Sequence, residues 1–240
     1  MHIQEVKHAI MLWLLLVMSS ATAFSVNYPK VFGSNWAIAA NYVIEHHSEW
    51  KKEFDLFDVD SRIAEAIIFP ELIRYSKWKD QIEQAAVNGL YVSRGIAGAN
   101  FSIGRFQMKP SFAEEVETAW NVSALSKEYG FVFNLQDNNE VRRSRIRRLS
   151  TEQGQCRYLA LFIRLLQQRH PQLLKLPKEA QVRFLATAYN RSFTDSWNAI
   201  LNIQSQRHFH TDIIKTHSTP LYCYADIALV FFKTIATIGE

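Results

Sequence analysis

The chain has 240 residues, of which 48% are hydrophobic and 21% are charged, and its formal net charge is +4. This composition is ordinary for a globular protein, and the sequence contains no internal repeat, low-complexity tract or clear linker. So small a positive charge suits an anionic partner without requiring one, and an ordinary, slightly basic surface explains it equally well.

The N-terminus carries the pattern of a secretory signal. A weakly basic start precedes an apolar run over residues 9–18, and Ala21-Thr22-Ala23 follows as a small-residue cleavage site. The run is too short for a stable membrane-spanning helix, and no cysteine follows it that could carry a lipid anchor. We therefore predict a signal peptide over residues 1–23 and one exported domain over residues 24–240, starting at Phe24. An uncleaved signal anchor is the alternative.

Helical spacing of apolar residues dominates the remaining chain, and no stretch alternates as a strand would. Helices are predicted over residues 34–50, 61–70, 79–93, 110–120, 142–149, 150–170, 177–190, 195–204 and 220–235, with a turn at 96–109 and irregular chain at 121–135. A chain of this size can bury one sizeable core. We therefore predict an all-α fold with a single domain.

The helix that ends near Pro70 delivers a carboxylate. Ile63 and Ile67 lie on an apolar stripe at helical spacing, which Pro70 and Glu71 continue. A glutamate on the core-facing side of a helix is uncommon. Because a proline lacks the backbone donor, the helix should kink or end there. These features predict an acid at the edge of an apolar wall, where burial raises a carboxyl pKa.

Three short blocks follow one another in a recognisable order. They are Ala66-Ile67-Ile68-x-x-Glu71, then Ser102-x-Gly104-x-x-Gln107-x-x-Pro110, then Ala188-Tyr189-Asn190. In this order they resemble the lytic transglycosylase and goose-type lysozyme group of the lysozyme-like superfamily, over about residues 60–192. The sequence departs from the family pattern at Leu72, where the family has serine, and at Arg191-Ser192, where it has Ala-Gly. The spacing between Glu71 and Gly104 is also longer.

The resemblance implies a lysozyme-like helical fold and an exported bacterial enzyme, periplasmic or secreted, that acts on peptidoglycan glycan strands. It would cleave the β-1,4 bond between N-acetylmuramic acid and N-acetylglucosamine, with Glu71 as acid and base. We expect no metal or other cofactor, no nucleic-acid partner and no stable membrane span. The rival hypothesis is a non-catalytic glycan-binding or scaffold protein on the same fold. A salt bridge from Glu71 to Arg74 or Lys77 is the structural alternative for the acid.

The resemblance also places further residues in the substrate-binding cleft, with the turn at Gly104 lining it. Glycine suits a position where backbone approaches a ligand. The resemblance implies this role for the turn with Gly104 and Gln107 and for Tyr189, and their neighbours Ser102, Phe106 and Asn190 are added as candidates from their own chemistry.

Several of these residues have structural alternatives. Ser102 could bond Glu71 or a sugar, or stabilise its own turn. Gln107 could be solvated at an ordinary helix-start turn. Tyr189 ends an apolar stripe, so it could be a core tyrosine whose hydroxyl bonds the backbone. Asn190 could cap its helix.

Aromatic residues offer sugar-stacking platforms, although most must belong to the core. Phe106, Tyr91 and Tyr224 are the candidates. No second catalytic carboxylate is evident, because Glu114 and Glu115 are expected in the first turn after Pro110, where acids suit a helix N-terminus. With the substrate N-acetyl group as internal nucleophile, the expected product is a 1,6-anhydro sugar. Lysozyme-type hydrolysis is the variant outcome.

A dense basic cluster spans Arg142 to Arg148. Such a cluster can grip nucleic acid or another anionic polymer. Because the chain has an export signal and no nucleic-acid-binding motif, a solvated helix face is the favoured interpretation.

Two other residue groups leave alternatives open. His208, His210 and His217 could bind a metal, but no further ligands are obvious, so a polar loop is favoured. Cys156 and Cys223 are the only cysteines in the sequence. A disulfide is possible in an exported protein, and buried free thiols are the alternative.

Overall fold

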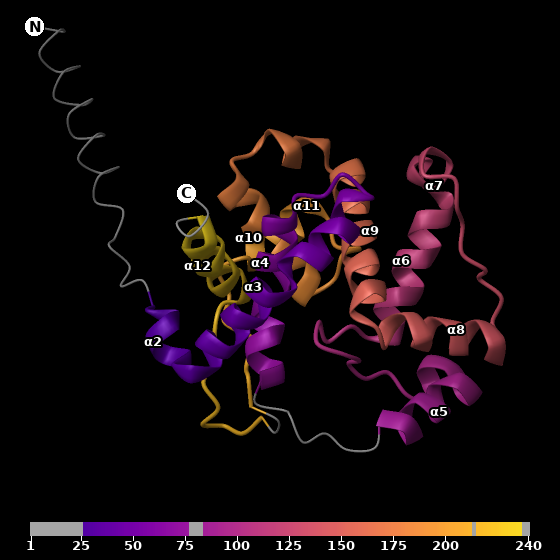
Figure 1. The fold of residues 1–240 in the computed structure, drawn as a ribbon, viewed down its shortest axis with the longest axis horizontal. Coiled ribbons are helices and arrows are strands. Elements are labelled where there is room, and N and C mark those ends of the chain that lie inside the picture. The colour runs from indigo at the N-terminus through magenta and orange to yellow at the C-terminus, as the bar shows by residue number, and fades with distance from the viewer. Residues whose placement is uncertain (1–25, 77–83, 213–214, 237–240) are drawn as a thin grey trace, which may run out of the picture.

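The computed structural model describes residues 26–76, 84–212 and 215–236 (Figure 1). The predicted signal peptide over residues 1–23 lies outside this part of the chain. Within it the chain is predominantly α-helical, with two isolated β-bridges and no strand, which confirms the predicted all-α class. None of the described helices is both long and apolar enough to cross a membrane.

The helices up to the middle of the chain are α2 (Tyr28–Phe32), α3 (Ser34–Asp55), α4 (Ser61–Ser76), α5 (Gln84–Arg94), η1 (Gly95–Ala97), α6 (Pro110–Val122) and α7 (Ala124–Glu128). The later helices are α8 (Asn139–Leu149), α9 (Glu152–Arg169), η2 (Pro171–Lys175), α10 (Lys178–Asn190), α11 (Trp197–Ile203) and α12 (Tyr224–Ala236). Most predicted helices are present with shifted ends. Helix α2 was not predicted, and α7 lies inside the stretch predicted to be irregular.

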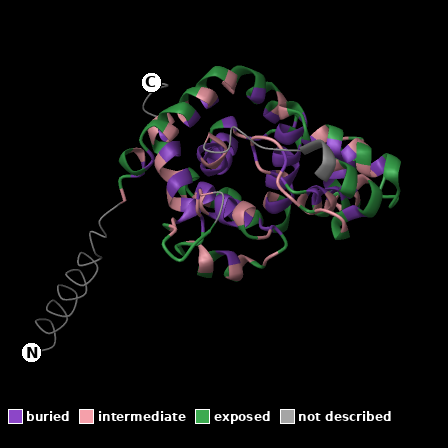
Figure 2. Cartoon of the chain, turned by 90° about the horizontal axis from the view of Figure 1, so that it is seen from below, coloured by how far each residue is buried: buried purple, intermediate pink, exposed green. Residues whose placement is uncertain are grey.

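Helix α4 forms the centre of the fold, packed by α3, α10 and α12. Its residues from Ile63 to Ile73 are all buried, and Figure 2 shows buried helices surrounded by helices with exposed outer faces. Phe69 stacks on Phe231 of α12 at a centroid distance of 3.6 Å and meets the edge of Trp36 on α3. The helix is apolar on every side because it is packed on every side.

The prediction that this helix ends near Pro70 was wrong, because α4 continues to Ser76. An internal proline removes one helical hydrogen bond and costs about 3 kcal/mol or more. Packing against three neighbouring helices compensates for that cost. As a result Glu71 lies within a continuous helix, and the turn that follows Pro70 adds Arg74 to the same element.

The arginine cluster is largely structural. Arg145 is buried and donates to Glu117 Oε2 from Nε at 2.9 Å, and Arg148 Nη2 donates to Glu117 Oε1 at 2.8 Å. Glu117 is itself fully buried on α6, so these bonds tie α8 to α6. The prediction of a solvated face is therefore wrong for Arg145. Removing one partner of such a buried group would leave an uncompensated charge.

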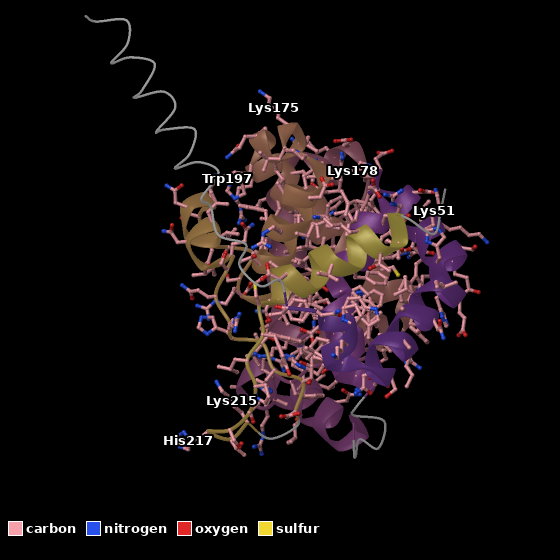
Figure 3. The ribbon with its side chains drawn as sticks, turned by 90° about the vertical axis from the view of Figure 1, so that its left-hand side faces the viewer. Lys51, Lys175, Lys178, Trp197, Lys215 and His217 are labelled. Carbon is pink, nitrogen blue, oxygen red and sulfur yellow. The ribbon has the colours of Figure 1, made fainter. Side chains whose placement is uncertain are left out.

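The cysteines and histidines have separate environments. Cys156 and Cys223 are both buried free thiols, and burial raises the pKa of each. His210 contacts the backbone oxygen of Asp212 through Nδ1, at 3.0 Å. Figure 3 shows Lys215 and His217 at the bottom of the view, on the connection between α11 and α12, far from Lys175 and Lys178 at the top.

Candidate active site

A mostly polar cavity of about 470 Å³ lies where the end of α4, the turn before α6 and the end of α10 meet. Glu71 lines it together with Ser102, Gln107, Tyr189 and Asn190. These residues come from three separate stretches of the chain. The fold therefore brings the three sequence blocks to one cavity.

Glu71 is buried in the cavity wall, with 5% of its surface exposed. Burial raises the pKa of its carboxyl above the ordinary value, and the charges of Arg74 and Lys109 oppose that rise. Arg74 Nη1 donates to Glu71 Oε2 at 3.0 Å. Among the described residues no group forms a hydrogen bond with Oε1, which leaves this oxygen as the one available for proton transfer.

Arg74 is fixed by contacts on the opposite side of its guanidinium. Its Nε donates to the backbone oxygen of His210 at 3.0 Å, and its guanidinium carbon lies 4.3 Å from the ring centroid of Phe209. The salt bridge that was the structural alternative for Glu71 is therefore present. Lys77, the other suggested partner, lies outside the described residues. Glu71 is therefore both a buried carboxyl in a salt bridge and an acid that lines the cavity.

The turn before α6 has a tight hairpin geometry. Ile103 and Met108 form an antiparallel bridge, with N–H···O distances of 2.8 and 3.2 Å. Gly104 has φ +63°, and a Cβ on it would lie 1.6 Å from Gln155 Nε2. A side chain there would displace the Gln155 amide, and the positive φ would strain any residue other than glycine. Gly104 does not line the cavity, and its predicted contact with substrate stays untested.

Gln155 holds this turn and was not identified from the sequence. Its Oε1 accepts from Phe106 N at 3.0 Å, and its Nε2 donates to the backbone oxygens of Ile103 and Leu149. The side chain is buried on α9. Because its partners lie some fifty residues earlier in the chain, no local pattern could have revealed it.

Gln107 is in a strained conformation at the cavity wall. Its φ is +54°, which is uncommon for a residue with a side chain. The Nε2 donates to Gly104 O at 2.8 Å, whereas Oε1 is buried and has no hydrogen-bond partner among the described residues. An unsatisfied buried acceptor costs about 1–3 kcal/mol. This atom is therefore ready to accept a hydrogen bond from a ligand donor in the cavity.

Tyr189 combines the two roles that were considered for it. Its hydroxyl donates to Phe106 O at 2.7 Å, which is the backbone bond expected of a core tyrosine. The side chain also lines the cavity, and burial together with the nearby Glu71 carboxylate raises its pKa well above the ordinary value. The hydroxyl therefore stays protonated. With its proton engaged, its oxygen can act only as an acceptor toward a ligand.

The predicted sugar-stacking aromatics are not on the cavity wall. The ring of Phe106 is fully buried and meets Trp50 edge-on at 5.0 Å, so only its backbone serves the site. Tyr91 is buried with its hydroxyl 2.6 Å from Glu114 Oε1, and the Tyr224 hydroxyl donates to Ile67 O. These rings lie in the core because burying apolar surface lowers the free energy of the folded state.

The acids of α6 do not occupy its first turn, contrary to the sequence prediction. Glu114 pairs with Arg145 at 3.0 Å. Glu115 instead lines the cavity, and its pKa is raised by burial and then by Glu114. A second carboxyl is therefore present on the wall. It follows Ser111 by one helical turn, and Ser111 also lines the cavity, so both side chains lie on the same face of α6.

Positive charges surround much of the cavity. Lys109 and Arg191 line it along with Arg74. Helix α10 ends at Asn190, and Arg191 stands as its C-cap residue. The departure from the family pattern at Arg191-Ser192 thus falls directly on the wall, whereas Leu72 is buried in the core.

Comparison with known proteins finds no similar family model, no similar curated protein and no similar solved structure. The functional assignment therefore depends on the geometry of the site and on the sequence blocks that meet there.

Proposed function

We propose that this protein cleaves the β-1,4 bond between N-acetylmuramic acid and N-acetylglucosamine in peptidoglycan, on a lysozyme-like helical fold and after export. The observation that carries the proposal is Glu71. It is a buried carboxyl of raised pKa on the wall of a polar cavity, where the three family-like blocks converge. A general acid needs a pKa near the working pH, and burial is the usual way to raise it.

In the first step, Glu71 Oε1 donates its proton to the glycosidic oxygen. The bond from that oxygen to the muramic acid C1 breaks, and the leaving sugar departs with a free hydroxyl. The substrate N-acetyl oxygen attacks C1 and stabilises the positive charge, so that no enzymic nucleophile is needed. Glu71 is left as a carboxylate, which the charges of Arg74 and Lys109 stabilise.

In the second step, the 6-hydroxyl of the same muramic acid attacks C1 and gives its proton to Glu71. The bond between C1 and the N-acetyl oxygen breaks at the same time, which regenerates the N-acetyl group. This restores the acid and forms a 1,6-anhydro ring. The reaction is intramolecular and is favoured by proximity. A water molecule that attacks in place of the 6-hydroxyl gives the hydrolysed sugar, which is the lysozyme outcome.

The cavity wall supports recognition of an N-acetylated sugar. The buried Oε1 of Gln107 has no hydrogen-bond partner in the part of the chain that the structure describes, and it can accept from the substrate amide N–H or a hydroxyl. The Tyr189 oxygen can accept a second hydrogen bond. Backbone strain at Gln107 costs about 1–3 kcal/mol and tends to concentrate at functional sites.

The test compares two glutamine variants of buried glutamates on α4. Glu71→Gln should lower the rate of turbidity clearing of purified wall sacculi by about 10²–10⁴-fold, because it removes the ionisable proton and keeps the shape. Glu65→Gln is the matched control, since Glu65 is equally buried on α4 but does not line the cavity. It should clear sacculi at about the wild-type rate. Equal rates for Glu71→Gln and wild type would overturn the proposal.

A second candidate function is glycan binding without cleavage. The observation that favours it is the ion pair between Arg74 and Glu71, because this pair stabilises the charged carboxylate and opposes a role as acid. A binder would leave sacculi intact and be retained by them. Sedimentation of wild type and Glu71→Gln with sacculi, followed by mass analysis of soluble fragments, separates retention from cleavage.

A further inference from the structure

A second cavity, of about 570 Å³, shares no lining residue with the candidate active site. It lies between the end of α3, the connection from α7 to α8 and the first turns of α9. Its volume falls within the range of small-molecule sites, about 300–1,000 Å³. The proposed function makes no use of it.

The inner wall of this cavity is aromatic and apolar. Phe57, Phe131, Phe133, Tyr158 and Leu161 line it. The rings of Phe133 and Tyr158 are nearly parallel, with centroids 6.2 Å apart. Tyr158 is buried and Phe133 is half-buried, so part of the aromatic surface remains open to a ligand. A flat apolar body would gain burial against these rings.

The rim of the cavity is cationic. Arg147, Arg148 and Arg157 line it, and none of its described lining residues carries a carboxylate. Arg148 pairs with the buried Glu117, and Arg157 pairs with Glu53. Arg147 is exposed on α8 and has no ion-pair partner among the described residues. One guanidinium of the rim is therefore uncompensated.

The start of α9 adds to this positive field. Thr151, Gln153 and Gly154 line the cavity, and they lie at the N-terminus of an 18-residue helix. Helix N-termini carry a partial positive charge that favours anions. The acid of this first turn, Glu152, is turned to α3 instead, where Trp50 Nε1 donates to it at 3.1 Å. It therefore does not cancel the field on the cavity side.

We propose that this cavity binds a small aromatic anion, such as an aromatic carboxylate or sulfonate. The acidic group lies at Arg147 and the first turn of α9, and the ring lies on the accessible part of Phe133. Guanidinium groups match the geometry of carboxylates and sulfonates and also stack on aromatic faces. Arg148 already lies over the Phe133 ring, 5.4 Å from its centroid, which prepares such a stack.

The test uses two fluorescent probes with the same rings. Anilinonaphthalene sulfonate is anionic, and phenylnaphthylamine lacks the sulfonate. Titration of the full chain should give tighter binding of the anionic probe, and the difference should shrink as salt is added because the rim is exposed. Equal affinity for the two probes would overturn the proposal.

Two variants of α8 locate the charge effect. Arg147→Gln should weaken binding of the anionic probe by about threefold to fivefold, as expected for an exposed charge, and leave the neutral probe unchanged. Arg143→Gln is the matched control, because Arg143 is exposed on the same helix, loses the same charge and does not line the cavity. Identical effects of the two variants would show a general charge effect and would overturn the proposal.

A third variant tests where the aromatic ring of the probe binds. Phe133→Leu should weaken both probes by a similar factor, because it removes aromatic surface without changing charge. Circular dichroism must show the same helix content as wild type. Unchanged affinity of both probes for a folded Phe133→Leu protein would place them elsewhere on the molecule and would overturn the proposal.

Discussion

Helix α4 carries two buried glutamates whose surroundings differ. Glu65 is 2% exposed and its carboxyl contacts His47 Nδ1 at 2.7 Å. Glu71 is 5% exposed, pairs with Arg74 and lines the polar cavity. Burial raises the pKa of both, to about 7 for Glu65. A raised pKa alone therefore does not distinguish a candidate catalytic acid from a structural one.

The difference between the two glutamates lies in access. Glu65 contacts His47 of α3 and does not line the cavity that Glu71 lines. Glu71 has one carboxyl oxygen that no other described residue bonds, and it shares the cavity wall with residues from the other two sequence blocks. Perturbed pKa values identify functional candidates only together with a cleft and a partner that can use the proton.

The largest stability effect should come from Glu65→Gln. The pKa of this carboxyl rises from 4.5 unfolded to about 7 folded, mainly by burial. The native state thus holds the proton more tightly, and its stability falls as pH rises from about 4.5 to 7. The glutamine variant avoids this loss. Its free energy of unfolding should match that of the wild type near pH 4 and exceed it by up to about 3 kcal/mol near pH 8. Urea unfolding of both proteins at the two pH values provides the measurement.

A pH-independent difference between Glu65→Gln and wild type would contradict this account. The charged groups around Glu65 are His47, Asp60 and Arg62. His47 contacts the carboxyl directly, so His47→Gln should be measured beside it. If removing His47 raises the pKa of Glu65 further, the stability of His47→Gln should keep falling to a higher pH than that of the wild type.

The second prediction concerns the pH dependence of activity. A general acid must be protonated, so the rate of sacculus clearing should fall as pH rises through the raised pKa of Glu71. Arg74 lowers that pKa through its charge and its hydrogen bond. Arg74→Met should therefore move the falling limb of the pH–rate profile to higher pH. Rates of both proteins over a pH series provide the measurement.

The control for Arg74→Met is Arg62→Met, an exposed arginine on the same helix outside the cavity. It should leave the falling limb in place. A downward shift in Arg74→Met would show that Arg74 serves another role than lowering the pKa of Glu71.

Much of the helical framework follows from local pattern, because apolar spacing reports which face of a helix is buried. The end of α4 could not be predicted in this way. Pro70 is locally unfavourable, and only the packing of three other helices explains why the helix continues. Local rules describe an isolated segment, whereas this segment is the most enclosed part of the molecule.

The candidate site also combines residues that local motifs predict with residues that only the tertiary structure reveals. The short motifs identified Glu71, Gln107 and Tyr189, which the fold brings to one cavity. Arg74 could be suggested from helical spacing, but Gln155 required the tertiary structure, because it lies far from Gly104 in the sequence. The aromatic platforms were misjudged since composition does not tell which rings face the core.

The third prediction concerns Tyr189→Phe. Its hydroxyl bonds Phe106 O, so its removal should cost about 1 kcal/mol of stability and leave that carbonyl without its donor. The rate of sacculus clearing should fall about fivefold or more. At low temperature the loss of stability alone would lower that rate by less. Rates at a temperature well below the melting transition provide the measurement. A lower melting temperature with an unchanged rate would assign Tyr189 to the core alone.

The last prediction concerns the product. We expect most released muramic acid to carry a 1,6-anhydro ring, because the 6-hydroxyl lies within the same sugar and attacks faster than an external molecule. The wall, however, is mostly polar and carries Glu115 as a second carboxyl. A second carboxylate can act as a base that activates water. A minor hydrolysed product, heavier by one water, is therefore expected from wild type.

Glu115→Gln should reduce the share of hydrolysed product with little effect on the total rate. Glu114→Gln is the neighbouring control, since Glu114 faces Arg145 instead. Mass spectrometry of digested sacculi measures both shares. Hydrolysed product alone, with Glu115→Gln as inactive as Glu71→Gln, would make the protein a two-carboxylate hydrolase.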